Sequence, residues 1–72
     1  MSTYVCIVFG AETDVLRMEA FEAAGDGQAC GRAIALQRTT ADSAAFELWR
    51  EGRKISAYYG RGANLLRETV NH

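Results

Sequence analysis

Two stretches in the first third of the chain have the pattern of β-strands. Tyr4–Phe9 is rich in β-branched and aromatic residues and ends at Gly10, which is typical of a strand buried on both faces. After a polar turn, Val15–Ala23 alternates charged and apolar side chains and predicts a second, half-exposed strand. The alternation slips near Ala20 and Phe21, so we expect either a bulge there or an apolar opposite face.

A helix is predicted from Asp26 to about Thr40. Gly25, Asp26 and Gly27 interrupt the strand pattern, and the Asp26 carboxylate is well placed to accept from the amides of the first turn. On a period of 3.6 residues one helix face carries mostly small side chains, which lets the helix lie close to a sheet. This face comprises Ala29, Ala33, Leu36 and Thr40, with Cys30 and Gln37 beside them.

The clearest local signal is Phe46–Tyr59, in which two alternating stretches flank Glu51 and Gly52. Glycine accepts the positive φ that a two-residue hairpin loop requires, and a three-residue loop would spoil the alternation. The shorter loop opposes Leu48 to Ile55 and Phe46 to Ala57 on one face, and Trp49 to Lys54, Glu47 to Ser56 and Ala45 to Tyr58 on the other.

The order strand, strand, helix, strand, strand predicts a single α+β domain over residues 1–60. Placing the most apolar strand centrally gives a ββαββ fold whose four-stranded antiparallel sheet has the order 2-1-3-4, with the helix packed on one face. We expect the C-terminal tail, residues 61–72, to form a short helix from Asn64 or to fray.

One helix cannot cover both faces of such a sheet. From the predicted register, the helix side receives Val5, Ile7, Phe9, Phe46, Leu48, Ile55 and Ala57. The face left open is apolar, and contiguous exposed apolar patches commonly mark interfaces. We expect a homodimer through this open face, with another protein as an alternative partner. The predicted interface residues are Tyr4, Cys6, Val8, Trp49, Lys54 and Tyr58. A further alternative is that the tail folds back and covers the face with Leu65, Leu66 and Val70.

The size of the chain also favours self-association. It has 72 residues, 49% hydrophobic and 24% charged, with a net charge of −1. So small a core supplies only a few kcal/mol of net stability, and small domains usually gain support from disulfides, a metal or oligomerisation. We expect no metal site, because the only cysteines are Cys6 and Cys30 and the only histidine is His72. A Cys6–Cys30 disulfide stays open, although two buried thiols are the better interpretation without a signal peptide.

We expect a cytoplasmic protein that is not an enzyme and holds no cofactor. The apolar run Val5–Phe9 is far shorter than the ~20 residues that span a bilayer, so no membrane association is expected. No Ser/His/Asp or Cys/His constellation can be built with the sole histidine at the end of the chain. The carboxylate pairs Glu47/Glu51 and Glu19/Glu22 are more simply interpreted as solvent-facing residues.

Charge is unevenly distributed along the chain. Residues 1–28 hold five acids and one base, whereas residues 29–72 hold seven bases and four acids. Bases near the second hairpin lie close to Trp49, Tyr58 and Tyr59, a combination found in proteins that bind single-stranded nucleic acid. A pI of about 5.7 argues against nucleic acid, which stays the alternative partner. The residues that would contact it are Arg50, Arg53, Lys54 and Arg61.

The second hairpin also carries a resemblance to other proteins. The run Phe46–Trp49, followed by Glu51-Gly52-Arg53, gives a W-x-x-G hairpin after an alanine-rich helix opened by Asp26. With the strand end at Phe21–Ala23, residues 4–59 resemble a group of short uncharacterised bacterial proteins built as hairpin, helix and hairpin. The resemblance implies the fold and no particular activity.

Overall fold

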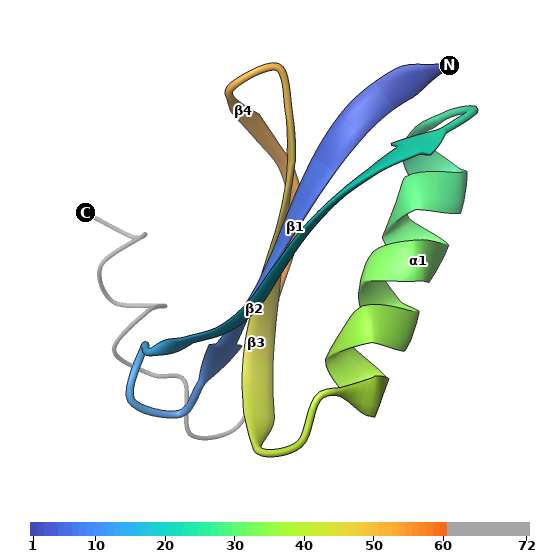
Figure 1. Ribbon diagram of the computed structural model, residues 1–72. Helices are drawn as coiled ribbons and strands as arrows, with labels where there is room; N and C mark the ends of the chain where they lie inside the picture. Colours follow the sequence, from blue (N-terminus) through green and yellow to red (C-terminus); the bar gives the residue numbers. More distant parts are fainter. Residues whose placement is uncertain (61–72) are drawn as a thin grey trace.

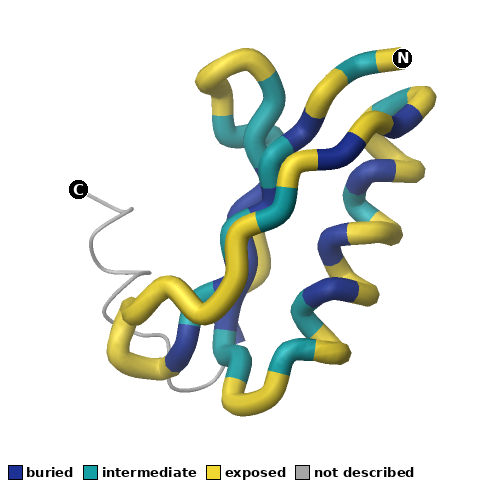
Figure 2. Tube along the Cα trace, viewed as in Figure 1, coloured by how far each residue is buried: buried dark blue, intermediate teal, exposed yellow. Residues whose placement is uncertain are grey.

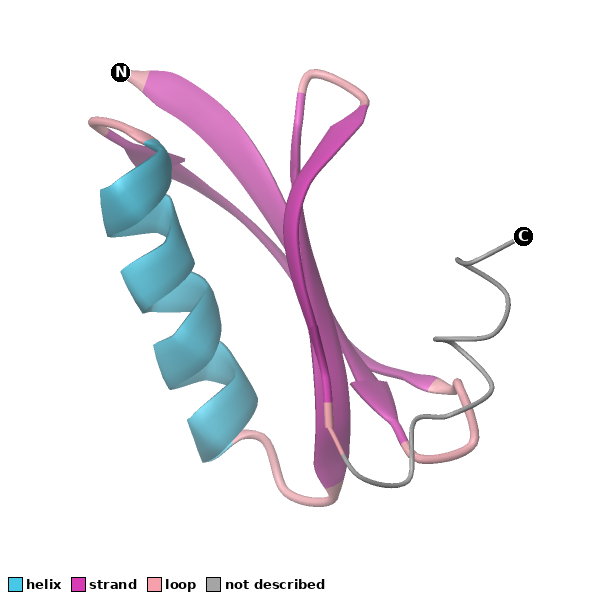
Figure 3. Ribbon diagram, turned by 180° about the vertical axis from the view of Figure 1, so that it is seen from behind, coloured by secondary structure: helices cyan, strands magenta, loops and turns pink. Residues whose placement is uncertain are grey.

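The computed structural model describes residues 1–60 and confirms the predicted α+β fold. Its elements are β1 (Ser2–Gly10), β2 (Val15–Ala23), α1 (Asp26–Thr39), β3 (Ser43–Arg50) and β4 (Arg53–Tyr59). The strands form one antiparallel sheet in the order β2-β1-β3-β4, with α1 along one face (Figure 1). The view from behind shows that no other helix of the described part lies on the opposite face, here called the open face (Figure 3).

The core lies between α1 and the sheet. Ala29, Ala33 and Leu36 are buried and confirm the predicted inner face of the helix. Figure 2 shows these buried turns facing the buried stretches of the strands. The core cluster comprises Tyr4, Cys6, Val8, Phe21, Ala23, Ala29, Ala33, Leu36, Phe46 and Leu48, with Cys30 and Ile55 packed against it.

The two faces of β1 are the reverse of our prediction. Tyr4, Cys6 and Val8 lie under α1 and are at most 1% exposed. Strand pairing sets this phase, because Cys6 lies beside Leu48 and paired side chains share a face of the sheet. Both sets of alternating residues in β1 are apolar, so hydrophobicity alone does not decide which set meets the helix.

The slip in β2 reflects an apolar opposite face and not a bulge at Ala20. Pairing with β1 is regular from Ala23 to Arg17, and the irregularity lies further along, between Val8 and Phe9 of β1. Phe21 and Ala23 are buried against α1. Met18 and Ala20 therefore point to the open face.

The β3–β4 hairpin confirms the two-residue loop but corrects the register behind it. Glu51 and Gly52 have φ values of 52° and 75°, as a type I′ loop requires. Trp49 pairs with Lys54 as predicted, and a bulge then shifts the partners by one residue. The observed pairs are Leu48 with Ser56, Glu47 with Ala57, Phe46 with Tyr58 and Ala45 with Tyr59.

The bulge in β4 redistributes its side chains between the two faces. Ile55 packs against the core as predicted. Ala57, predicted on the helix side, pairs with Glu47 on the open face and is exposed. The shift also places Tyr59 on the open face, where its hydroxyl donates a hydrogen bond to Glu47.

The start of α1 differs from the predicted cap. The N-cap residue is Gly25, which has extended backbone and no side-chain cap hydrogen bond. Gln28 accepts a hydrogen bond from the Ala24 N–H at 2.7 Å and holds the chain entering the helix. Asp26 is already helical and does not cap, because its carboxylate is engaged by the sheet.

Candidate functional site

The open face divides into an apolar half and a polar cluster. The apolar half consists of Val5, Ile7, Phe9, Met18 and Ala20, from β1 and β2. The β1 residues are half-buried, whereas Met18 is 62% exposed. The polar cluster consists of Glu47, Trp49, Lys54 and Tyr59, from β3 and β4. Contact between water and the apolar half is therefore unfavourable relative to burial of the same surface.

Glu47 is the centre of the polar cluster. Although charged, it is only 9% exposed. Its carboxylate accepts from Trp49 Nε1 at 3.2 Å, from the Tyr59 hydroxyl at 3.1 Å and from Lys54 Nζ at 3.5 Å. These donors satisfy a carboxylate that would otherwise be costly to bury.

Lys54 completes the polar cluster between two aromatic rings. Its Nζ lies 6.0 Å from the centroid of Trp49 and 5.8 Å from that of Tyr59, within reach of cation–π attraction. The hydrogen bond from Nζ to the Tyr59 hydroxyl, at 3.0 Å, and the charge of Glu47 raise the pKa of Lys54. The cluster is thus internally charge-balanced and fixes the Trp49 ring on the open face.

A second polar group joins the start of α1 to the sheet. The Tyr4 hydroxyl and Arg50 Nη1 both donate to Asp26 Oδ1, each at 2.8 Å. The hydrogen bond to Asp26 raises the pKa of the Tyr4 hydroxyl. Arg50 therefore has its carboxylate partner within the fold.

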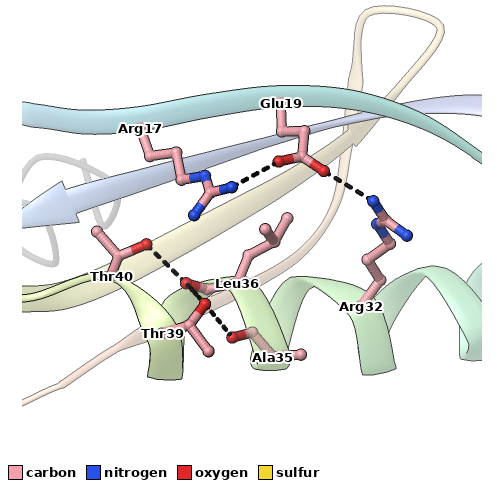
Figure 4. A network of polar contacts seen from close by, with 7 residues as sticks. All are labelled: Arg17, Glu19, Arg32, Ala35, Leu36, Thr39 and Thr40. Carbon is pink, nitrogen blue, oxygen red and sulfur yellow. Dashed lines mark hydrogen bonds and ion pairs between the residues drawn. The ribbon is translucent and has the colours of Figure 1, made fainter.

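A third group joins β2 to α1 and is shown in Figure 4. The Glu19 carboxylate accepts from Arg32 at 2.8 Å and from Arg17 at 3.1 Å. The Arg32 hydrogen bond is the main reason why the pKa of Glu19 is lowered. Arg32 also lies 5.0 Å from the centroid of the Phe21 ring, so it covers an edge of the core.

The predicted interface residues do not share one surface. Tyr4, Cys6 and Val8 are buried beneath α1, which corrects their assignment to the open face. Tyr58 is 52% exposed but pairs with Phe46 and so lies on the helix side. Trp49 and Lys54 lie on the open face as predicted. The apolar residues of the open face are instead those of the apolar half, of which the correct phase of β1 would have identified Val5, Ile7 and Phe9.

The basic residues of the nucleic-acid alternative do not form one unpaired patch. Arg50 pairs with Asp26 at 2.8 Å and Lys54 pairs with Glu47 at 3.5 Å. Arg53 is exposed next to the hairpin loop. Arg61 and the predicted tail helix lie outside the described residues. Two of the three described bases therefore already have a carboxylate partner.

The two cysteines are free thiols in different environments. Cys6 is buried and Cys30 is half-buried against the core. Burial is the main cause that raises the pKa of Cys6 to about 11. Within residues 1–60, no group of three or more His, Cys, Asp or Glu side chains is placed to hold a metal ion. The helix of this range, α1, is not long and apolar enough to cross a membrane.

Comparison with family models, curated proteins and solved structures gives no match to the chain. The resemblance to hairpin-helix-hairpin proteins therefore stays a prediction.

Proposed function

We propose that the protein is a small non-enzymatic interaction module that forms a homodimer through the open face of its sheet. The observation that supports this proposal is the apolar half, in which Met18 is 62% exposed next to three half-buried β1 side chains. Burying such a surface is favourable by about 25 cal/mol per Å². A chain of this size gains from that contribution because its own core is small.

A second copy of the chain suits this face better than a charged partner. A twofold axis through the apolar half sets uncharged residues of one copy, such as Ile7 and Met18, against the same residues of the other. The neighbouring charges, Glu47 and Lys54, are already paired with each other. The face can therefore be buried against itself without leaving an unpaired charge, which is the main cost of burying polar surface.

Two free thiols support a reducing compartment as the place where the module acts. Cys6 and Cys30 both belong to or touch the core and form no disulfide with each other. Disulfides are rare in the cytosol, where thiols stay reduced. We therefore keep the cytoplasm as the proposed location.

Sedimentation equilibrium from low to high micromolar concentration tests the homodimer. The expected mass is twice the 7.9 kDa of the chain. Met18→Glu places a charge in the apolar half and should give a monomer, while its circular dichroism stays native because Met18 is largely exposed in a single copy. The matched control is Ala35→Glu, on the exposed side of α1, which should still dimerise.

Two results would contradict the proposal. One is a monomer at every concentration for the unchanged protein. The other is that Met18→Glu associates as strongly as Ala35→Glu, since the interface would then lie elsewhere.

A further inference from the structure

The helix side of the sheet is covered unevenly. α1 packs mainly against β3, with further contacts to β1 and β2, and leaves the helix side of β4 largely uncovered. A groove of about 460 Å³ lies between the C-terminal half of α1 and β4. It is lined by residues that include Ile34, Gln37, Arg38, Phe46, Ser56 and Tyr58.

The groove has an apolar base and two apolar sides. Phe46 is 4% exposed and forms the base. The Tyr58 ring stacks on it with centroids 6.3 Å apart and an interplanar angle of 26°. Ile34 approaches from α1, and both Ile34 and Tyr58 are large apolar side chains that remain exposed. This arrangement suits a flat apolar group.

The polar side chains of the groove add one unpaired positive charge. Arg38 is exposed, and no ion pair joins it to any residue of the described part of the chain. Gln37 is held in place, because its Nε2 donates to Ser43 Oγ at 3.1 Å and Ser43 Oγ donates to the Gln37 carbonyl at 2.6 Å. No acidic side chain is among the groove residues within 1–60. The groove therefore favours an anion.

We propose that this groove binds small amphipathic anions, with a flat apolar body between the exposed side chains of Ile34 and Tyr58 and a carboxylate on the Arg38 guanidinium. Guanidinium groups bind carboxylates through two parallel hydrogen bonds. The groove volume falls within the range of about 300–1,000 Å³ found for small-molecule sites. Because the apolar half lies on β1 and β2 whereas the groove lies between α1 and β4, a dimer formed through the apolar half leaves the groove accessible.

Titration of ¹⁵N-labelled protein with indole-3-acetate, followed by amide chemical shifts, tests this site. Shifts should be confined to the C-terminal half of α1 and to β3 and β4 around Phe46. Indole-3-acetamide, which has the same ring but no charge, should bind about fivefold more weakly, as one charge-assisted contact in a partly desolvated site supplies.

Three variants separate the contributions to binding. Arg38→Gln should make the acid and the amide bind equally. Arg53→Gln removes an exposed arginine outside the groove and should keep the difference between them. Met18→Glu, in the open face, should bind indole-3-acetate unchanged, so this result is independent of the homodimer.

The site would be excluded by the absence of shifts at millimolar indole-3-acetate or by shifts centred on the open face. Equal affinity for acid and amide in the unchanged protein would overturn the role of Arg38.

Discussion

The Glu47 carboxylate accepts hydrogen bonds from three side chains on the open face. Only the contact with Lys54 is an ion pair that requires the charge of Glu47. Glu47→Gln keeps the size of the side chain but removes the ion pair with Lys54 and leaves the ammonium beside a neutral amide. We expect this variant to lower the free energy of unfolding by about 1 kcal/mol, as for a partly exposed hydrogen-bonded pair. Urea unfolding measures the loss. Glu12→Gln, in the exposed β1–β2 turn, is the control, and an equal effect of both variants would refute the role assigned to the cluster.

The two thiols should differ in reactivity because their surroundings differ. Cys6 is 1% exposed and burial raises its pKa to about 11, so it offers little thiolate to an alkylating reagent at pH 8. Cys30 is half-buried on α1 and should react first. Treatment of native protein with iodoacetamide should add one group, located at Cys30 by mass spectrometry, and unfolding in urea should expose the second. Modification of Cys6 in the native state would contradict the observed core.

At the scale of elements, two glycines should respond in opposite ways to replacement by alanine. Gly31 lies inside α1, and a Cβ there would meet no heavy atom within 4 Å. Gly31→Ala should raise stability by about 0.5–1 kcal/mol, because alanine has less conformational entropy to lose in a helix. A Cβ on Gly60 would lie 2.7 Å from the Ala44 carbonyl oxygen, so Gly60→Ala should destabilise by about 1–3 kcal/mol. Thermal unfolding distinguishes the two, and a stabilising Gly60→Ala would show that this contact yields easily.

The elements themselves could be predicted from sequence, but the phase of β1 could not. Val15–Ala23 matches β2 at both ends, and the glycine of the second hairpin predicted its loop. Such features depend on local alternation and turn chemistry. The face that β1 turns to α1 depends on its pairing with β3, and both of its faces are apolar. The bulge at Ile55 was not predicted because neither alternation nor turn chemistry marks it, and it brings Tyr59 within hydrogen-bonding distance of Glu47.

The candidate site was predicted less completely than the fold. An open apolar face follows from a single helix on four strands, and Trp49 and Lys54 were placed on it correctly. Tyr4, Cys6 and Val8 were misplaced with the phase of β1, and Tyr58 was misplaced with the register of β4. Alternation placed Glu47 correctly on the same face as Trp49, but its interpretation as a solvent-facing residue was wrong, because it is only 9% exposed. Its three hydrogen-bond donors come from β3 and β4. Their meeting at Glu47 depends on the register of this hairpin, which the sequence pattern did not predict.

At the scale of the whole molecule, Glu19 links helix and sheet in a pH-dependent way. Its pKa is lowered from 4.5 in the folded state, chiefly by Arg32, so its stabilising contribution is complete above that value. The contribution is lost as the pH falls through the lowered pKa, where the folded state also takes up the proton. The thermal midpoint of Glu19→Gln should therefore lie below that of the unchanged protein at pH 7 and approach it in acid.

Glu22→Gln is the matched control for this dependence. Glu22 is exposed on the same strand and forms no ion pair with any residue in the range 1–60. Its replacement should shift the thermal midpoint little at any pH. A Glu19→Gln difference that stays constant from pH 7 into acid would contradict the link through the carboxylate.

The uneven cover by α1 also sets an order in which the native protein opens. Strands β1 and β3 are flanked by strands on both sides and lie under the helix, whereas β4 has a strand on one side and little helix above it. Segments with few buried contacts open at lower free energy than the rest of the molecule. Amide protons of β4 should therefore exchange with deuterium through local fluctuations, while those of β1 wait for global unfolding. The β4 side of the groove thus belongs to the part of the molecule that can adjust its shape without disturbing the core.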